Sequence, residues 1–349
     1  MDSFIPALRQ ELDMRQHYIP GVIINTIYFG GGTPSLLRPN LIKQILDSLL
    51  TRFSVSRLPE ITLEANPEDI TPQRIKEYCE MGINRLSLGV QSFHDADLNL
   101  LNRSHTGKQA MNAVRLMKHS GFTNFSIDLL YGIPGQTLKR WRKILESAVG
   151  LNIPHISAYA LTVEKGTALD LLVRKGKFPS PDEDLSLEHF LLLTDFLNDN
   201  GYIHYEISNF CLPGFESVHN SNYWKGIMYM GLGPSAHSFN GQSRQWNISN
   251  LTEYLKAMKD HSPCWEKEVI TPVSKFNELV MLSLRTRWGC DLAVVEEQFG
   301  TQCTSHLKQQ SLPYIQEGMM RESENKLVLT RKGMFLSDSI IADLFLEDK

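Results

Sequence analysis

Three consecutive glycines, Gly30, Gly31 and Gly32, close an apolar run at residues 22–29 and are followed by Thr33. Glycine has no Cβ, so the main chain here can meet a group that a side chain would keep away. Free N–H and C=O groups at the carboxyl end of a strand are suited to hydrogen-bonding a small molecule. The segment therefore predicts a ligand contact made through the backbone.

Polar side chains also end the apolar runs that follow. Glu64, Gln91, Asp128 and Tyr159 each lie within or directly after such a run. A single carboxylate in this position is usually a solvated cap or an ion-pair partner. A succession of such groups does not suit a hydrophobic core, but it is typical of a site that hydrogen-bonds a ligand. We therefore expect a polar edge at the carboxyl ends of successive strands.

These residues need a scaffold that brings strand ends together, and the chain alternates strand-like with helix-like segments. The expected strands are residues 22–29, 60–65, 85–90, 125–131, 155–161 and 202–207, and the expected helices are 41–52, 73–81, 107–120, 138–151 and 185–200. Intervals of about 25 to 45 residues between strands suit right-handed βαβ units and a parallel sheet. The predicted fold class is α/β, a partial parallel βα barrel, with a doubly wound sheet as the competing topology.

The pattern divides the chain into three parts. The barrel is expected over residues 1–225 and a loop-rich connecting region over 226–272, where Gly, Ser and Asn are frequent. Helical periods and a short apolar run then follow at 276–286, 292–299, 307–317 and 327–329. They predict a small, mainly helical winged-helix-like domain over 273–349. Residues 275–349 hold nine Lys/Arg against eleven Asp/Glu, so the basic face that nucleic acid requires is missing.

Composition excludes several classes of protein. The 349 residues carry a formal net charge of −4 and contain no apolar run of about 18 residues that would span a bilayer. The first 16 residues lack the features of a signal peptide. The cysteines, Cys79, Cys211, Cys264, Cys290 and Cys303, are odd in number and widely separated. We expect them to be buried and reduced, in a cytoplasmic protein with no nucleic-acid partner and no integral membrane segment.

Several strings of residues resemble one protein family. They are YFGGGTPS (28–35), ITLEANPE (61–68), NRLSLGVQSF (84–93), NRSHTGKQA (102–110) and SIDLLYGIPGQT (126–137). Together they are similar to the radical S-adenosylmethionine (radical SAM) proteins related to oxygen-independent coproporphyrinogen III oxidase. The likeness covers nearly the whole chain, and the strings occur in the family's order. The resemblance implies a barrel of the radical SAM type.

The resemblance also implies a set of residues around S-adenosylmethionine. Backbone groups would approach its methionyl end at Gly30, Gly31, Gly32 and Thr33. Its amino, ribose and carboxylate groups would be bound by Glu64, Gln91, Arg103 and Asp128, and its adenine would be flanked by Leu130. Without the resemblance, Arg103 would be interpreted as a surface guanidinium that follows a helix.

The sequence departs from this family at its start. Members carry a CxxxCxxC loop after the first strand, whose three thiolates hold a [4Fe–4S] cluster and leave the fourth iron for S-adenosylmethionine. No such motif occurs here, and the spacing of the five cysteines provides no substitute. We expect that the first strand and its loop are missing, because the chain starts at an internal methionine or is a shortened relative. Such a chain should neither assemble the cluster nor cleave S-adenosylmethionine reductively.

Another string, HNSNYW, begins at His219 and matches the HNxxYW string of the HemW branch, whose members are regarded as haem chaperones. The resemblance implies that haem is a ligand. A neutral imidazole from His219 would ligate the iron, while Tyr223 and Trp224 would cover a porphyrin face. Asn220 belongs to the same string. His237, on a glycine-rich segment, is a second candidate.

Three functional hypotheses follow. The leading one is a haem-binding and haem-delivery protein whose partners are haem and an acceptor protein. The alternative is an oxygen-independent coproporphyrinogen III oxidase, a dehydrogenase of porphyrin biosynthesis that decarboxylates two propionates through a 5′-deoxyadenosyl radical and therefore needs the cluster. The third is an inactive, N-terminally truncated form, in which the strand at residues 22–29 becomes an exposed edge and invites aggregation.

Overall fold

The computed structural model describes residues 3–347, and a seven-stranded sheet forms its largest part. The strands are β1 (Ile24–Phe29), β2 (Val55–Ala65), β3 (Arg85–Gln91), β4 (Phe125–Tyr131), β5 (His155–Ala160), β6 (Ile203–Glu206) and β7 (Asn209–Cys211). Their order is β1-β2-β3-β4-β5-β7-β6, with β1 to β5 parallel and β7 antiparallel to both of its neighbours. The sheet curls into a partial barrel, which confirms the predicted fold class.

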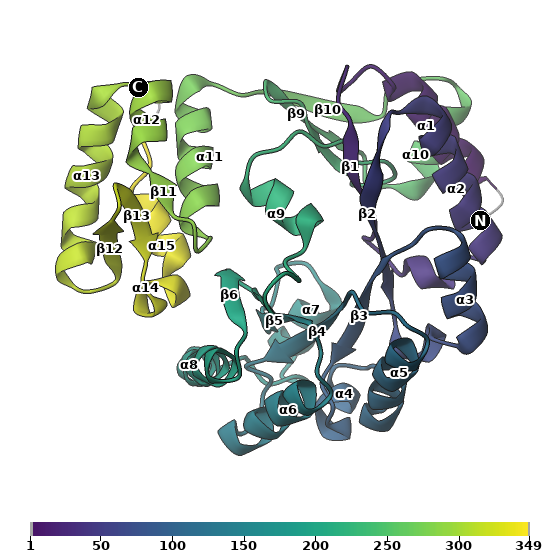
Figure 1. Cartoon of the computed structure of the whole chain (residues 1–349), viewed down its shortest axis with the longest axis horizontal. Helices are drawn as coiled ribbons and strands as arrows, with labels where there is room; N and C mark the ends of the chain where they lie inside the picture. The colour runs from purple at the N-terminus through teal and green to yellow at the C-terminus, as the bar shows by residue number, and fades with distance from the viewer. Residues whose placement is uncertain (1–2, 348–349) are drawn as a thin grey trace.

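Helices cover the outer, convex face of this sheet (Figure 1). They are α2 (Pro39–Arg52), α3 (Pro72–Glu80), α4 (Asp95–Leu100), α5 (Gly107–His119), α6 (Leu138–Gly150) and α8 (Glu183–Asp199), and a further short helix, α7 (Ala168–Arg174), follows β5 in the chain. Local capping residues set the ends of α3. Thr71 accepts a hydrogen bond from the N–H of Arg74 at the start of α3, and Gly82 follows that helix with φ of +88°.

Alternation along each strand separates an apolar face from a polar one. On β4, Phe125, Ile127 and Leu129 belong to the hydrophobic core under the helices, whereas Ser126 and Asp128 lie on the other, concave face. The same division holds on the neighbouring parallel strands. We call the space enclosed by the concave face the lumen.

The hairpin of β6 and β7 differs from the expected succession of parallel strands. β7 lies between β5 and β6, so the sixth expected strand is not a direct neighbour of the fifth. With only three residues, β7 is too short to show a periodic pattern in the sequence.

Residues 226–272 are not the loops that the sequence suggested. They contain β8 (His237–Phe239), β9 (Ser243–Asn247), α10 (Leu251–Lys259) and β10 (Trp265–Val269), which form a small antiparallel sheet with one helix. The inward side chains of this sheet are polar and bind a buried ion pair on α1 (Phe4–Arg15). Arg15 donates to Ser238 at 2.8 Å and to Gln245 at 3.0 Å, and Glu11 accepts from Asn247 at 2.6 Å. The strands show no apolar alternation, because their inward side chains are polar and hydrogen-bonded.

The C-terminal region has the element order of a winged helix. It comprises α11 (Pro272–Leu284), β11 (Cys290–Asp291), α12 (Leu292–Phe299), α13 (Thr301–Gln316), β12 (Met320–Ser323), β13 (Lys326–Leu329), α14 (Arg331–Phe335) and α15 (Ser337–Asp343). Its core is continuous with that of the barrel, and Phe335 on α14 packs against Phe190 on α8 with ring centroids 5.7 Å apart. The domain limits at residues 225 and 272 remain a prediction.

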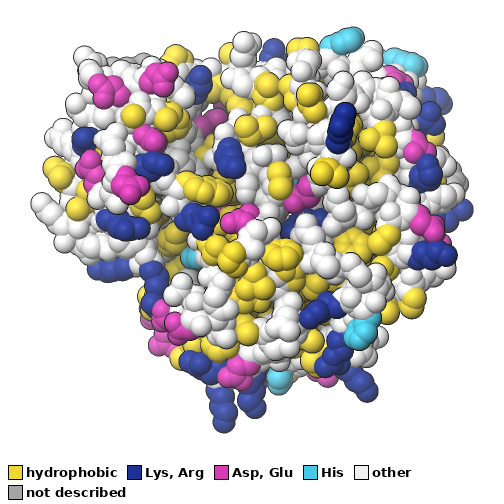
Figure 2. Space-filling model, viewed as in Figure 1, with side chains coloured by type: hydrophobic (Ala, Val, Ile, Leu, Met, Phe, Trp, Pro, Cys, Tyr) yellow, Lys and Arg dark blue, Asp and Glu magenta, His cyan; other side chains and the backbone are white. Residues whose placement is uncertain are grey.

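The short helix α9 (Val218–Trp224) lies between the C-terminal region and the partial barrel, facing the lumen (Figure 1). It packs against β1 on one side and α11 on the other. On the face shown in Figure 2, side chains of both charge signs are interspersed. Within residues 3–347, no helix combines the length and apolar character needed to cross a membrane.

Candidate functional site

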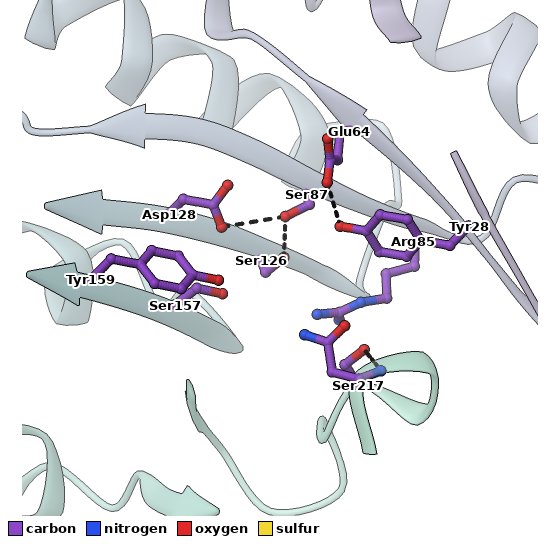
Figure 3. Close-up of a pocket in the computed structure, with 10 residues that line it drawn as sticks. Tyr28, Glu64, Arg85, Ser87, Ser126, Asp128, Ser157, Tyr159 and Ser217 are labelled. Atoms are coloured by element: carbon purple, nitrogen blue, oxygen red, sulfur yellow. Dashed lines mark hydrogen bonds between the residues drawn. The ribbon is translucent and has the colours of Figure 1, made fainter. Parts of the chain in front are cut away.

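A polar cavity occupies the lumen, because the strand register places hydrophilic side chains side by side (Figure 3). Glu64 on β2 pairs with Ser87 on β3, and Asp128 on β4 pairs with Ser157 on β5. The cavity is lined by Tyr28, Glu64, Arg85, Ser87, Ser126, Asp128, Ser157, Tyr159, Ser217 and Asn220. Five strands and α9 thus contribute hydrogen-bonding groups to one concave site, as is typical of ligand pockets.

The glycine segment, residues 30–32, contacts the carboxylate of Glu64. The hydroxyl of Tyr28 donates to Glu64 Oε1 at 2.7 Å, and the N–H of Gly31 donates to Glu64 Oε2 at 3.2 Å. A Cβ added at Gly30 would lie 2.5 Å from Tyr28 Cε1 and 2.8 Å from Glu64 Oε1. Glycine therefore suits this position, because the Tyr28 and Glu64 side chains pack directly against its Cα.

Asp128 has an unusual protonation equilibrium. Burial, together with the negative charge of Glu64, raises the pKa of Asp128 from 3.8 to about 7. The hydroxyl of Ser87 lies 3.4 Å from Asp128 Oδ1, and Ser126 donates to Ser87 at 2.9 Å. Asp128 can therefore hold or release a proton near neutral pH, beside the other carboxylate of the site.

A buried carboxylate on β2 fixes helix α9 over the lumen. The two oxygens of Glu60 accept hydrogen bonds from the backbone N–H groups of Val218 (3.1 Å) and His219 (2.8 Å). Ser217 caps the helix by accepting from the N–H of Asn220. The start of α9 is thereby tied to the sheet, which sets the direction of the side chains it carries.

His219 is held from three sides. Its Nδ1 lies 2.9 Å from Thr26 Oγ1, its ring stacks on Tyr28 with centroids 4.6 Å apart, and Tyr223 meets it edge-on at 5.0 Å. Burial, assisted by the positive charge of Arg85, lowers the pKa of His219 to about 4, so the imidazole is neutral at physiological pH. Among residues 3–347, Nε2 has no hydrogen-bond partner. A neutral ring oriented through Nδ1 with a free Nε2 fits a metal-ligand role.

The other residues expected around S-adenosylmethionine are spread along the carboxyl edge of the sheet. Gln91 is buried at the end of β3 with φ of +63°, an uncommon conformation for a residue other than glycine. Leu130 is half-buried, and its carbonyl accepts from Gln136 at 3.4 Å. Thr33 is half-buried beyond the glycines, and Arg103 is exposed after α4. None of these four lines the cavity described above, although Glu64 and Asp128 do.

The residues expected to bind haem do not all lie at the cavity. Asn220 lines the cavity, and Tyr223 is 41% exposed beside His219 at its rim. Trp224 is half-buried at the end of α9. His237 is instead exposed on β8, where its ring stacks on Trp246 with centroids 6.3 Å apart. The structure therefore does not bring His237 into the lumen.

Comparison with known proteins identifies the family. Residues 9–148 match the radical SAM superfamily, and residues 270–336 match the HemN C-terminal domain. The haem chaperone HemW of Lactococcus lactis is 34% identical over 93% of this chain and 86% of its own length, and HemW of Bacillus subtilis is 31% identical over 97% and 90%. The chain belongs to the HemW family. Coproporphyrinogen III oxidase (HemN) from Escherichia coli, 23% identical, shares the fold over 99% of this chain and 83% of its own, with a TM-score of 0.84.

Membership of the HemW family, within the radical SAM superfamily, implies S-adenosylmethionine and a [4Fe–4S] cluster. The open backbone at Gly31 and Gly32, where a Cβ would meet nothing within 4 Å, and the adjacent carboxylate of Glu64 fit the hydrogen-bonding groups of S-adenosylmethionine. The cysteines do not fit the cluster. They lie in separate parts of the fold, and within residues 3–347 no group of three His, Cys, Asp or Glu side chains is arranged to hold a metal ion. Cys79 is exposed on α3, contrary to the expected burial of every cysteine.

Several residues of the site were not predicted from the sequence. Tyr28, Arg85 and Glu60 were not selected as site residues, although all three build the lumen. The sequence does contain a pattern that could have identified such residues. Polar residues alternate with apolar ones within the strands, as in Arg85-Leu86-Ser87-Leu88. Such alternation predicts a strand with one polar face, so it identifies residues along the whole strand as well as at its end.

Proposed function

We propose that this HemW-family chain binds haem through His219 and passes it to an acceptor protein. The observation that carries the proposal is the way the imidazole is held. The hydrogen bond between Nδ1 and Thr26 fixes the ring, the low pKa keeps it neutral, and Nε2 is left without a partner. These are the properties that an imidazole ligand to iron requires.

The surroundings of His219 suit a planar aromatic ligand. Tyr223 stands at right angles to the imidazole and is partly exposed, so its ring can contact a porphyrin. Trp224 ends the same helix. The haem chaperone name of the Lactococcus and Bacillus relatives supports haem as the ligand. Delivery would follow when an acceptor supplies a competing ligand to the iron.

We also propose a set of residues that would bind S-adenosylmethionine. Residues 30–33, with Glu64, Gln91, Arg103, Asp128 and Leu130, would hold it at the carboxyl edge of the sheet. The cofactor supplies a 5′-deoxyadenosyl radical in enzymes that bind it to a reduced iron–sulfur cluster. The oxidase alternative depends on that chemistry, and residues 3–347 supply no cysteine set for the cluster. No observation on the described residues favours it over haem carriage.

The test is a haem titration of the purified chain, followed by the Soret absorption band. We expect saturable binding whose band position and affinity change in His219→Ala, with a loss of at least about tenfold. His237→Ala is the matched control, because this exposed histidine lies on β8 outside the lumen. Equal spectra and affinities for the wild type and His219→Ala would refute the proposal.

A further inference from the structure

Arg85 is a buried cation that makes no ion pair with any of residues 3–347. It is the first residue of β3, only 2% exposed, and its side chain extends into the lumen toward the segment that carries Ser217 (Figure 3). Among the described residues, the side chain of Arg85 donates one hydrogen bond, from Nη1 to Asn124 Oδ1 at 2.8 Å. No carboxylate oxygen of these residues lies within 4 Å of its guanidinium nitrogens. A guanidinium carries five N–H donors, and buried charges are normally paired.

The carboxylates nearby are engaged elsewhere or kept at a distance. Glu60 accepts the backbone N–H groups at the start of α9, and Glu64 binds Tyr28 and the glycine segment. Asp128 lines the same cavity and is attracted electrostatically by Arg85, but makes no ion pair with it. Besides the carboxylates of Glu64 and Asp128, the cavity that the guanidinium faces is lined by neutral hydrogen-bonding groups: the serine hydroxyls of residues 87, 126, 157 and 217, the phenols of Tyr28 and Tyr159, and the amide of Asn220.

Resting on the proposed function, we propose that Arg85 and the hydroxyls around it form a subsite for a carboxylate of the bound porphyrin, a haem propionate. Planar, bidentate recognition of a carboxylate is the interaction for which a guanidinium is shaped. Ser217 and Asn220 come from the helix that carries His219. The iron ligand and two groups of the carboxylate subsite thus come from one helix and its cap.

Arg85 lies at the level of His219 along the sheet, away from Gln91 at the other end of its own strand. Arg85 begins β3 and Gln91 ends it. At about 3.3 Å per residue, the two ends of β3 lie about 20 Å apart. The strand register sets Arg85 level with Thr62 on β2 and with Tyr28 on β1, the residue on which the His219 ring stacks. Glu64 and Asp128 line the same cavity as Arg85, so the test has to separate haem from S-adenosylmethionine.

The test compares haem with its dimethyl ester, in which both propionates are blocked. The full chain is titrated with each compound as the wild type, as Arg85→Gln and as the control Arg57→Gln, whose arginine is exposed on β2. We expect wild type to prefer haem, and Arg85→Gln to lose at least about tenfold in haem affinity while binding the ester as before. The Soret band that reports His219 should be retained. Arg57→Gln should match wild type.

Other results would overturn the inference. If Arg85→Gln weakens the binding of haem and of its ester equally, or leaves both affinities unchanged, Arg85 does not bind the propionates. An affinity for S-adenosylmethionine that depends on Arg85, with haem unaffected, would assign the subsite to the cofactor. If wild type binds no haem, the proposed function itself fails. If haem binds through His219 and only the ester comparison is flat, this inference alone fails.

Stability provides an independent measurement. Because the guanidinium has no ion pair, we expect ligand-free Arg85→Gln to unfold in urea at no lower concentration than wild type. Should Arg85→Gln fail to fold, Arg85→Lys keeps the charge but loses the fork, and the wild-type preference for haem over its ester still decides the proposal. A wild type that binds both compounds equally would refute it without any variant.

Discussion

The raised pKa of Asp128 leads to a prediction about stability and pH. Burial and the charge of Glu64 shift this pKa from 3.8 to about 7. Asp128→Asn removes the titration while keeping a similar shape and an oxygen that can accept from Ser87. At neutral and alkaline pH the wild type bears the cost of a buried, ionised carboxylate, and the variant does not. We therefore expect Asp128→Asn to stabilise the protein, increasingly so as the pH rises.

The sign and size follow from proton linkage. Between about pH 4 and pH 7 the folded state holds the Asp128 proton and the unfolded state has lost it, so folding stability falls as the pH rises. A difference of about three pKa units corresponds to about 4 kcal/mol at about pH 8, but only to about 2 kcal/mol at about pH 5. The advantage of Asp128→Asn should therefore grow by about 2 kcal/mol or more over that interval.

Urea unfolding at the two pH values provides the assay. The control is Asp199→Asn, because Asp199 is exposed at the end of α8 and its replacement should have a small effect that does not vary with pH in this way. A free-energy difference between Asp128→Asn and wild type that is the same at both pH values would refute the argument. So would a variant that is less stable than wild type at the higher pH.

Two further substitutions test the packing of the site. Gly30→Ala should destabilise the fold by about 1–3 kcal/mol, because the new Cβ would lie 2.5 Å from Tyr28 and 2.8 Å from Glu64. Gly32→Ala is its control, with nothing within 4 Å, and equal urea midpoints for the two variants would contradict the crowding. Glu60→Gln should cost about 1–3 kcal/mol, since it weakens the acceptor for two N–H groups of α9. An unchanged midpoint would show that the carboxylate does not anchor the helix.

The sequence predicts the architecture well where hydrophobic pattern and local signals agree. All six expected strands correspond to β1 to β6, since each is a run of apolar or β-branched residues bounded by turns. The seventh strand is too short for that test. The small sheet of residues 237–269 was missed because Glu11 and Arg15 fill its interior with hydrogen bonds, so no apolar alternation marks it.

The sequence likewise indicated some residues of the candidate site and not others. Glu64 and Asp128, expected around S-adenosylmethionine, line the same cavity as Asn220, which belongs to the string that resembles HemW. His237 does not join them, because β8 belongs to the separate small sheet. Arg85 was overlooked because an arginine at the start of an apolar strand suggests a solvated end. Its burial depends on α9, which closes the lumen from more than a hundred residues away in sequence.

The most direct test of the central claim is chemical rescue of the iron ligand. Removing the imidazole in His219→Ala leaves a space between Thr26, Tyr28 and Tyr223, which free imidazole can enter. The account predicts that the ferric haem spectrum of His219→Ala differs from that of wild type and returns to it when imidazole is added. A spectrum unaffected by the substitution, or one that imidazole does not restore in a folded variant, would contradict haem ligation by His219.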